Sequence, residues 1–402
     1  MFYRENDFNE TPIGKIPKDW QVLKLGEVMS LEYGKGLPEN SRVKGAYPVV
    51  GSNGIVGYHA EALVKGPGIV VGRKGTIGAV SWIDTDFWPI DTTYYVKTER
   101  NDIFLKWLFL ELQHANLTKL HLADVVPGLK RDLAYMIRIP LPPIEEQKAI
   151  VGVLGVVDLA VARAGEVIAK TERLKKGLMQ TLLTRGIGHK EYKQTPIGTI
   201  PKEWEIVKLD DVVLEAKSGF ASGERDGNGI LQLRMDNIET EGWINPEAGV
   251  WVPTPQNVDE YILKPNDILF NNTNSVDLIG KTAIFRGELS RCVYSNHLTR
   301  IRGNPERVIP EWILFMLIRK WQTGIFKAIC HRHVHQAGIN NSDLLNIKIP
   351  IPKIPEQQKI AQILSATDKK LKLERQERTR LERIKQGLMD LLLTGKIRIK
   401  VD

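Results

Sequence analysis

Two short polar turns carry residue types that bind nucleic acid. In the first half of the chain, Arg73, Lys74 and Thr76 lie in a turn that contains glycines. Glycine lets a backbone approach another molecule closely, and arginine or lysine can bind a phosphate or a guanine edge. The corresponding place in the second half holds Asn272 and Asn274, whose amides can pair with adenine or hold phosphates. For any one of these residues an ordinary β-turn is the alternative interpretation.

Further polar residues occur in similar turns. Asn53 in the first half, and Arg234 with Asn237 in the second, form a matched pair of turns. The chain also has a formal net charge of +8, which favours a polyanionic partner. We therefore predict DNA contacts at Asn53, Arg73, Lys74, Thr76, Lys130, Arg131, Arg234, Asn237, Asn272, Asn274, Lys281, His333 and His335.

A histidine cluster raises the question of a metal site. On a strand, His331, His333 and His335 would point to the same side, and three imidazoles could bind zinc. No second pair of ligands with the usual spacing is nearby, and Arg332 suits a loop that contacts phosphates or bases. We predict no metal site here, with contact to nucleic acid or a plain surface as the remaining interpretations.

Catalytic motifs are missing. The sequence has no Asn/Asp-Pro-Pro-Tyr/Phe loop of a methyltransferase and no glycine-rich loop that opens a helix around a cofactor. Gly280, Lys281 and Thr282 resemble the end of a phosphate-binding loop, but Ser275 stands where its first glycine should be. We predict no catalytic residue in this chain. A stand-alone metal-dependent nuclease that uses the histidine cluster is the alternative.

The chain of 402 residues contains an internal duplication. Residues 11–28 and 195–212 share 11 of 18 positions, at a separation of 184 residues. Residues 139–150 and 349–360 form a second matched pair, at a separation of 210 residues. The framework is repeated while the segments between these blocks have diverged. Such a pattern suits a scaffold that presents two different recognition surfaces.

Each half ends in a segment with the periodicity of a long helix. After the proline-rich hinges, apolar residues recur at steps of three and four, which is the spacing of a two-helix seam. The predicted helices span Glu145–Leu183 and Glu356–Leu393, and Lys175, Glu374 and Arg378 interrupt the pattern. The predicted seam residues are Ile150, Leu154, Val157, Val161, Ile168, Leu178, Ile360, Leu364, Leu371, Leu381, Leu388 and Leu392.

Because each helix follows an equivalent domain, two-fold-related packing would make the two helices antiparallel. Glycines at 186, 188 and 395 are placed to end them. The alternative is that each helix pairs with another chain, which would make the protein a coiled-coil adaptor without a DNA role.

The remaining segments contain short β-branched runs separated by turns. We expect curled antiparallel sheets with small helices at Asp102–Gln113 and Pro310–Thr323. Two cysteines, Cys292 and Cys330, do not make a disulfide framework, so a reducing compartment is expected. No apolar stretch reaches the length of a membrane span, and the first residues do not form a signal peptide.

The paired openings, the two Ile-Pro-x-Pro hinges and the two Gly-Leu-Met-x-x-Leu-Leu-Thr helix ends resemble the specificity subunits of type I restriction–modification systems. The resemblance covers essentially the whole chain. It implies an α+β fold with two tandem α/β target-recognition domains, related by a pseudo-two-fold axis. It also implies an intramolecular antiparallel coiled coil that separates them. The implied division is 1–143 and 188–354 for the recognition domains, and 144–187 and 355–402 for the spacer helices.

The resemblance also implies a function. Each domain would read one half of an asymmetric, bipartite site in double-stranded DNA, and the chain itself would be non-catalytic. Two methyltransferase subunits would dock on the frame, with or without two restriction and translocation subunits. S-adenosylmethionine, ATP and Mg²⁺ would act on those partners, with no cofactor in this chain. The expected location is the prokaryotic cytoplasm, at the nucleoid when DNA is bound.

Overall fold

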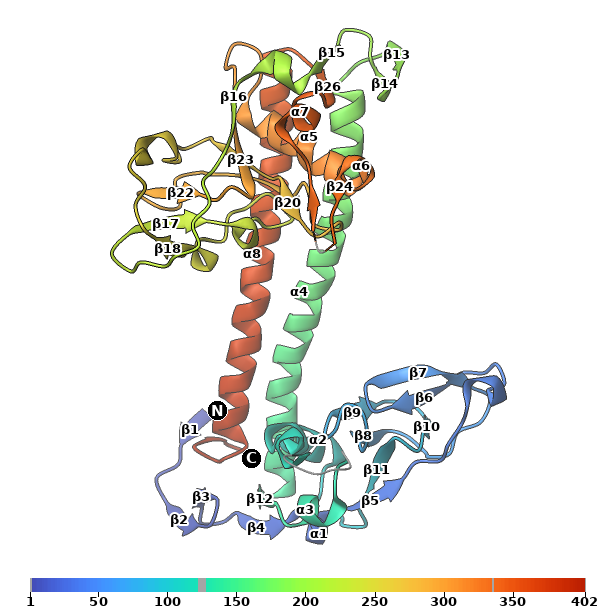
Figure 1. Ribbon diagram of the computed structural model, residues 1–402. Coiled ribbons are helices and arrows are strands. Elements are labelled where there is room, and N and C mark those ends of the chain that lie inside the picture. The colour runs from blue at the N-terminus through green and yellow to red at the C-terminus, as the bar shows by residue number, and fades with distance from the viewer. Residues whose placement is uncertain (1, 122–127, 335, 402) are drawn as a thin grey trace. The chain divides into compact units, whose positions relative to one another are not determined.

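The computed structural model describes residues 2–121, 128–334 and 336–401. The chain forms two compact units. Unit 1 comprises Met1–Gly165 and Gln376–Asp402, and unit 2 comprises Glu166–Arg375. Two long helices, α4 (Ile144–Arg185) and α8 (Ile354–Leu392), each contribute one part to either unit (Figure 1). The 42 and 39 residues of these helices confirm the two long segments expected from the seam periodicity.

Unit 1 is built around a four-stranded antiparallel sheet with the order β5-β11-β8-β9. Helix α2 (Leu105–His114) contacts β8 and β9. It begins three residues later, and ends one residue later, than the expected helix Asp102–Gln113. The strands of this sheet are β5 (Ser30–Tyr33), β11 (Thr93–Lys97), β8 (Gly68–Gly72) and β9 (Val80–Ile83). A smaller sheet contains β10 (Trp88–Pro89), β6 (Tyr47–Gly51) and β7 (Gly54–His59).

Unit 2 repeats this plan. Its four-stranded sheet has the order β16-β23-β19-β21, and helix α5 (Pro310–Gln322) contacts three of these strands. The strands are β16 (Val213–Ser218), β23 (Leu298–Gly303), β19 (Ile268–Asn271) and β21 (Thr282–Ile284). The smaller sheets comprise β18 (Val250–Val252), β17 (Ile230–Leu233) and β22 (Cys292–Tyr294), and β20 (Thr273–Asn274), β25 (Ala337–Gly338) and β24 (His331–Arg332).

The expectation of purely antiparallel sheets is wrong in one respect. Strand β10 pairs with β6 in parallel, and β22 pairs with β17 in parallel. A parallel pair needs a long crossover connection, and here the four-stranded sheet of each unit supplies part of that connection. Sequence patterns show where strands lie but not which distant strand returns beside them. The two parallel pairs occupy the same place in both units.

The duplicated blocks form the same framework in each unit. The openings form hairpins and then strands that pair antiparallel with the hinges. The elements are β2 (Phe8–Thr11), β3 (Gly14–Pro17), β4 (Gln21–Lys24) and β12 (Arg138–Leu141) in unit 1, and β13 (Tyr192–Thr195), β14 (Gly198–Pro201), β15 (Glu205–Lys208) and β26 (Lys348–Ile351) in unit 2. Strands β1 (Phe2–Arg4) and β27 (Ile397–Ile399) pair the two ends of the chain.

A glutamate–glutamine pair links each opening to the following long helix. Trp20 donates its indole N–H to Glu146 at 3.1 Å, and Trp204 donates to Glu356 at 3.0 Å. The neighbouring Gln147 donates to the hinge carbonyl of Pro142 at 2.9 Å, as Gln357 does to Pro352 at 2.8 Å. These contacts explain why the Trp and Glu-Gln residues recur in both halves.

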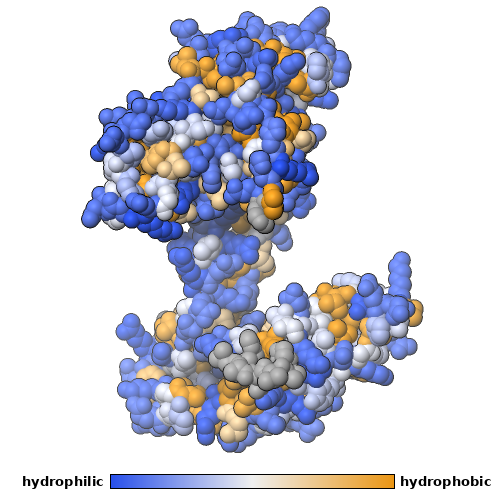
Figure 2. Space-filling model, in the orientation of Figure 1, coloured by the Kyte–Doolittle hydropathy of each residue, from blue (hydrophilic) through white to orange (hydrophobic). Residues whose placement is uncertain are grey.

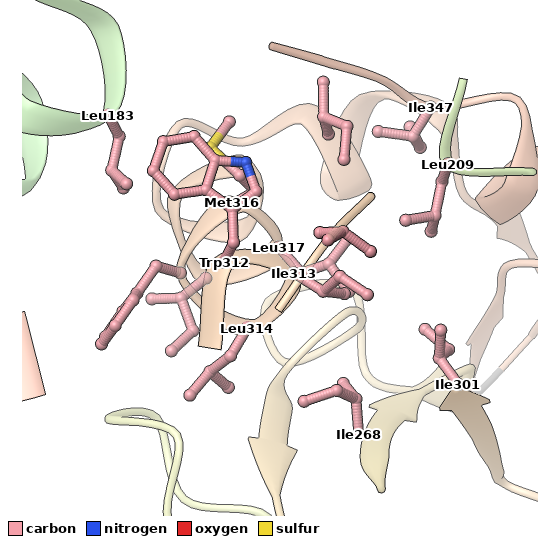
Figure 3. Close-up of a cluster of buried hydrophobic side chains, with 14 of the residues drawn as sticks. Leu183, Leu209, Ile268, Ile301, Trp312, Ile313, Leu314, Met316, Leu317 and Ile347 are labelled. Atoms are coloured by element: carbon pink, nitrogen blue, oxygen red, sulfur yellow. The ribbon is translucent and has the colours of Figure 1, made fainter. Parts of the chain in front are cut away.

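The two helices run antiparallel within each unit. In unit 1, Ile150 and Leu154 near the start of α4 share a core with Met389 and Leu392 near the end of α8. In unit 2 the relation is reversed, because the end of α4 shares a core with the start of α8. Figure 3 shows Leu183 of α4 beside Trp312 and Met316 of α5 in this second core. The expected antiparallel, intramolecular packing is therefore confirmed.

All twelve predicted seam residues are buried or half-buried. Lys175, which interrupts the apolar series, is also buried and forms an ion pair with Asp368 of α8 at 2.5 Å. The glycines at 186 and 395 follow the helices with φ of 64° and 68°, as expected for residues that end a helix in the left-handed region.

Candidate nucleic-acid interface

The loop after β8 is held from two sides in unit 1. Arg73 donates its backbone N–H to the carbonyl of Thr92 at 2.9 Å, and Leu129 donates to the carbonyl of Arg73 at 2.9 Å. A Cβ on Gly72 would lie 2.1 Å from the carbonyl oxygen of Thr76, and Gly75 has a φ of 75°. Only glycine fits these two positions without strain. The loop that carries Arg73, Lys74 and Thr76 therefore has a defined shape.

Arg73 is part of a cluster of cations and aromatic rings. Its guanidinium lies 5.3 Å from the ring of Tyr33, and the guanidinium of Arg131 lies 4.6 Å from the same ring. Tyr33 is 52% exposed, and its ring lies 5.1 Å from that of Tyr94. Burial raises the pKa of Tyr94 to about 12, so this hydroxyl stays neutral at physiological pH. The cluster places two positive charges on one exposed aromatic ring.

The turn with Asn53 lies against the same loop. Its neighbour Ser52 has side-chain atoms 3.3 and 3.0 Å from the positions where Gly72 and Gly75 would carry a Cβ. Asn53, Lys74 and Thr76 are exposed. Lys130, next to Leu129, is exposed as well. The structure thus brings the six predicted residues of unit 1 to one surface, while their contact with DNA stays a prediction.

The corresponding loop of unit 2 has the same backbone connections. Asn272 donates its backbone N–H to the carbonyl of His297 at 3.0 Å, and Ile339 donates to the carbonyl of Asn272 at 2.9 Å. Asn272 follows β19 as Arg73 follows β8, and both strands hold the same place in their sheets. Arg73 and Asn272 therefore occupy equivalent positions, as the sequence comparison predicts.

The chemistry at this place is different in unit 2. The amide of Asn272 donates to Thr299 Oγ1 at 3.0 Å, and Thr299 Oγ1 donates to Asn341 Oδ1 at 3.0 Å. Ser218 Oγ lies 3.4 Å from Thr299 Oγ1. Asn272 is buried and Asn341 is half-buried. An uncharged network of amides and hydroxyls thus replaces the cations of unit 1.

This network lines an open groove of about 680 Å³. The groove is lined by Ser218, Asn272, Thr273, His331, His333, Gly338, Ile339, Asn340 and Asn341. His331 and His333 are exposed, and His331 Nε2 lies 2.8 Å from Asp343. The groove offers amide, hydroxyl and imidazole groups in one place, which are groups that bind base edges and phosphate oxygens.

Four other predicted residues of unit 2 serve internal contacts. Lys281 is buried and donates to the carbonyl of Ile238 at 2.6 Å, and burial lowers its pKa. Asn237 is fully buried and donates to the carbonyl of Asn245 at 2.6 Å. The guanidinium of Arg234 donates to Gln232 and to the carbonyl of Ser222. Asn274 is buried, and its Oδ1 accepts the N–H of Ser275 at 2.7 Å. These side chains stabilise the loops, and their contact with DNA stays a prediction.

The histidine segment gives no metal cluster in the described part of the chain. No group of three or more His, Cys, Asp or Glu side chains that could hold a metal ion is found among those residues. His335 lies outside them. His333 lies in the connection between β24 and β25, where its N–H donates to the carbonyl of Gln336 at 2.7 Å.

Five residues of these two clusters were missed by the sequence comparison, namely Tyr33, Tyr94, Ser218, Thr299 and Asn341. They come from strands and a helix start rather than from turns rich in glycine. Aligning the two halves through Leu129 and Ile339 would have found Arg131 and Asn341 as a pair, because both lie two residues further on. On the face shown in Figure 2, hydrophilic residues cover most of both units.

The comparison with known proteins decides the family. The family model for the type I restriction modification DNA specificity domain matches residues 17–169 and 201–383. The chain belongs to this family. It is therefore a type I specificity subunit, a non-catalytic component that recognises DNA sequence.

Relatives of the same name extend over the whole chain. The MjaVIII specificity subunit of Methanocaldococcus jannaschii is 28% identical, over 100% of this chain and 98% of that protein. A putative MjaX specificity subunit of the same organism is also 28% identical, over 100% of this chain and 99% of the relative.

Solved structures show the same fold. The S subunit of a type I system from M. genitalium aligns with a TM-score of 0.63 and 15% identity, over 97% of each chain. A chain from a structure of a type I restriction–modification complex aligns with a TM-score of 0.57 and 18% identity, over 95% of this specificity subunit and 99% of that chain. No helix in the described residues is long and apolar enough to cross a membrane.

Proposed function

We propose that this specificity subunit recognises an asymmetric, bipartite sequence in double-stranded DNA, with one half-site bound by each unit. The observation that carries the proposal is the equivalence of Arg73 and Asn272. The same backbone hydrogen bonds hold both residues, but Arg73 presents a cation and Asn272 presents a neutral amide. A repeated frame that presents different groups at the same place binds two different half-sites, so the whole sequence is asymmetric.

The proposal extends to the partners. Two methyltransferase subunits dock on the repeated framework, one for each unit, with or without two restriction and translocation subunits. S-adenosylmethionine, ATP and Mg²⁺ act on those partners, and this chain binds no cofactor. The complex works in the prokaryotic cytoplasm and at the nucleoid when it is bound to DNA. The duplicated frame supports two copies of one partner, because each unit offers an equivalent surface.

Methylation mapping tests this function. The chain is expressed with its methyltransferase subunit in a host that lacks the system, and modified bases are mapped across the genome. The expected result is one split motif with two different halves, which disappears when this chain is left out. A contiguous motif, or the same motif without this chain, would contradict the proposal.

A second candidate function, a metal-dependent nuclease, is tested by metal analysis of the purified chain. Stoichiometric zinc together with DNA cleavage by this chain alone would favour it. The groove at His331 and His333 favours DNA contact instead, because amides line it together with the histidines.

A further inference from the structure

Four positions of the framework are matched between the two units. Tyr33 pairs with Tyr94 across β5 and β11 in the register in which Ser218 pairs with Thr299 across β16 and β23. Arg73 and Asn272 share their backbone hydrogen bonds. Arg131 and Asn341 are the first residues of helices α3 (Arg131–Tyr135) and α7 (Asn341–Leu345). We call these sets the unit 1 quartet (Tyr33, Arg73, Tyr94, Arg131) and the unit 2 quartet (Ser218, Asn272, Thr299, Asn341).

The unit 1 quartet holds two cations in fixed positions. Arg73 donates Nε–H and Nη2–H to the carbonyl oxygen of Asp91 at 3.0 and 2.6 Å. Arg131 donates from Nη1 to the carbonyl oxygen of Leu31 at 3.3 Å. A guanidinium has five N–H donors, so each of these retains several for another ligand. Carbonyl oxygens orient the guanidiniums but do not neutralise them.

The described part of the chain supplies no counter-ion to this quartet. Among the residues that the structure describes, no carboxylate oxygen lies within 4.0 Å of the guanidinium nitrogens of Arg73 or Arg131. Two like charges on one ring repel each other, and the half-exposed ring of Tyr33 offsets that repulsion only in part. An anion bound between them would remove the repulsion.

The unit 2 quartet has no charge at the same positions. Its members satisfy one another through Thr299, and Asn341 also donates to the carbonyl of Ala216 at 3.4 Å. Neutral amides and hydroxyls can bind base edges or phosphate oxygens, but they release no counterions from DNA. The two quartets therefore differ in how their binding should depend on salt.

We propose that the unit 1 quartet binds a phosphate of the DNA backbone, with Arg73 and Arg131 as its ligands and Tyr33 as their support. The unit 2 quartet contacts its own half-site through uncharged hydrogen bonds. A phosphate fits better than a base, since a guanine edge is matched by one guanidinium, whereas two guanidiniums side by side match a compact anion. This inference rests on the proposed function, because it takes DNA as the ligand.

The salt dependence of binding tests the inference. The chain is reconstituted with its methyltransferase subunit, and its affinity for a mixed-sequence DNA duplex and for a duplex with the mapped motif is measured over a range of salt concentrations. Arg73→Gln/Arg131→Gln should weaken binding to both duplexes. It should also reduce the slope of log K against log salt by about 1, the value for one lost phosphate contact. Ser218→Ala/Asn341→Ala should weaken binding to the motif duplex and leave the slope unchanged.

Two control variants separate charge from folding. Arg73→Lys/Arg131→Lys retains both charges and should keep most of the slope. Lys15→Gln removes a cation from hairpin β2–β3, which Figure 1 shows to the left of β4, with β5 to its right, and should leave the slope unchanged. Thermal unfolding of each variant shows whether it is folded.

The outcomes are distinct. An unchanged slope in folded Arg73→Gln/Arg131→Gln overturns the phosphate site and leaves the proposed function standing. An equal loss of slope in Ser218→Ala/Asn341→Ala overturns the difference between the quartets. If the unaltered complex binds neither duplex, the proposed function itself fails.

Discussion

Glu146 and Glu356 hold equivalent places, but their surroundings differ. Glu146 is 1% exposed and accepts two hydrogen bonds, at 3.0 and 2.7 Å, from the guanidinium of Arg398, which also pairs with Asp19 and Glu5. These hydrogen bonds raise the pKa of Arg398, so its charge is permanent. Glu356 instead accepts the N–H of Ile187 and lies 2.9 Å from His189 Nε2. The end of the chain is thus tied to unit 1 by a charge network.

Removal of the carboxylate charge should affect the two places unequally. Glu146→Gln leaves the guanidinium of Arg398 with Asp19 and Glu5 but weakens its hydrogen bonds to the most buried carboxylate, and should lower the free energy of unfolding by about 2 kcal/mol. Glu356→Gln keeps neutral hydrogen bonds at its place and should cost about 1 kcal/mol. Denaturant titration of both variants measures the difference. Equal losses would mean that the Arg398 network does not stabilise unit 1.

Glu111 gives unit 1 an unusual pH dependence. The side chain is buried, and burial raises its pKa to about 8. Between pH 4.5 and 8 the unfolded chain ionises while the folded chain keeps the proton, so stability falls as the pH rises. The equivalent place in unit 2 holds Met316, since Trp107 of α2 corresponds to Trp312 of α5.

Glu111→Met should therefore stabilise the protein at neutral pH. The gain in the free energy of unfolding should be about 3 kcal/mol at pH 7 and below about 1 kcal/mol at pH 5. Denaturant titrations at both values measure it. His114 lies 4.0 Å from Glu111, so His114→Gln is the matched control. A pH dependence that His114→Gln removes and Glu111→Met retains would refute this explanation.

At the residue scale, the sequence predicts the place of Arg73 and Asn272 but not their surroundings. Residue types show which groups can bind DNA, whereas burial depends on packing that no local pattern reveals. Lys281 and Asn237 are polar residues in turns, and both are directed to backbone carbonyls inside unit 2. Tyr33 was missed because an aromatic residue on a strand is usually part of a core.

At the element scale, the two helices are joined by two matched ion pairs. Lys175 of α4 pairs with Asp368 of α8 at 2.5 Å in unit 2, and Lys385 of α8 pairs with Asp158 of α4 at 2.6 Å in unit 1. The two lysines are 210 positions apart in the sequence, and so are the two aspartates. Burial raises the pKa of Asp368, and Lys175 opposes this shift. A polar pair inside an apolar seam favours one register over others.

These pairs should differ in strength. The side chains of Lys175 and Asp368 are 9% and 7% exposed, against 25% and 46% for Lys385 and Asp158. Asp368→Asn should cost about 3 kcal/mol because it leaves a buried ammonium without its partner. Asp158→Asn should cost less than about 1 kcal/mol. Thermal unfolding of the two variants compares them, and a larger effect of Asp158→Asn would refute the role of burial.

The helices were predictable from sequence because apolar residues recur at steps of three and four along both of them. Lys175 interrupts the apolar series in the sequence, but in the structure it is a buried position of the seam, where Asp368 neutralises its charge. The parallel pairs β6–β10 and β17–β22 were not predictable, because each joins strands that are far apart in the sequence.

At the scale of the whole molecule, one framework is used twice with different contents. The matched blocks form the openings, hinges and long helices of both units, and the diverged segments carry the quartets. Each helix contributes to both units, and we propose that its length sets the spacing between the two half-sites. In this account the loops determine which bases are read, and the helices determine how far apart they lie.

Shortening both helices tests that account most directly. Residues 159–165 and 378–384 face each other in unit 1, and deleting both removes one seven-residue repeat from each helix while the seam keeps its phase. The loss is about 10 Å, or about three base pairs of DNA. Methylation mapping should show that sites with the original spacing are no longer modified, and any motif that remains should keep its two halves with a shorter gap. Modification of the original motif at its original spacing would contradict the account.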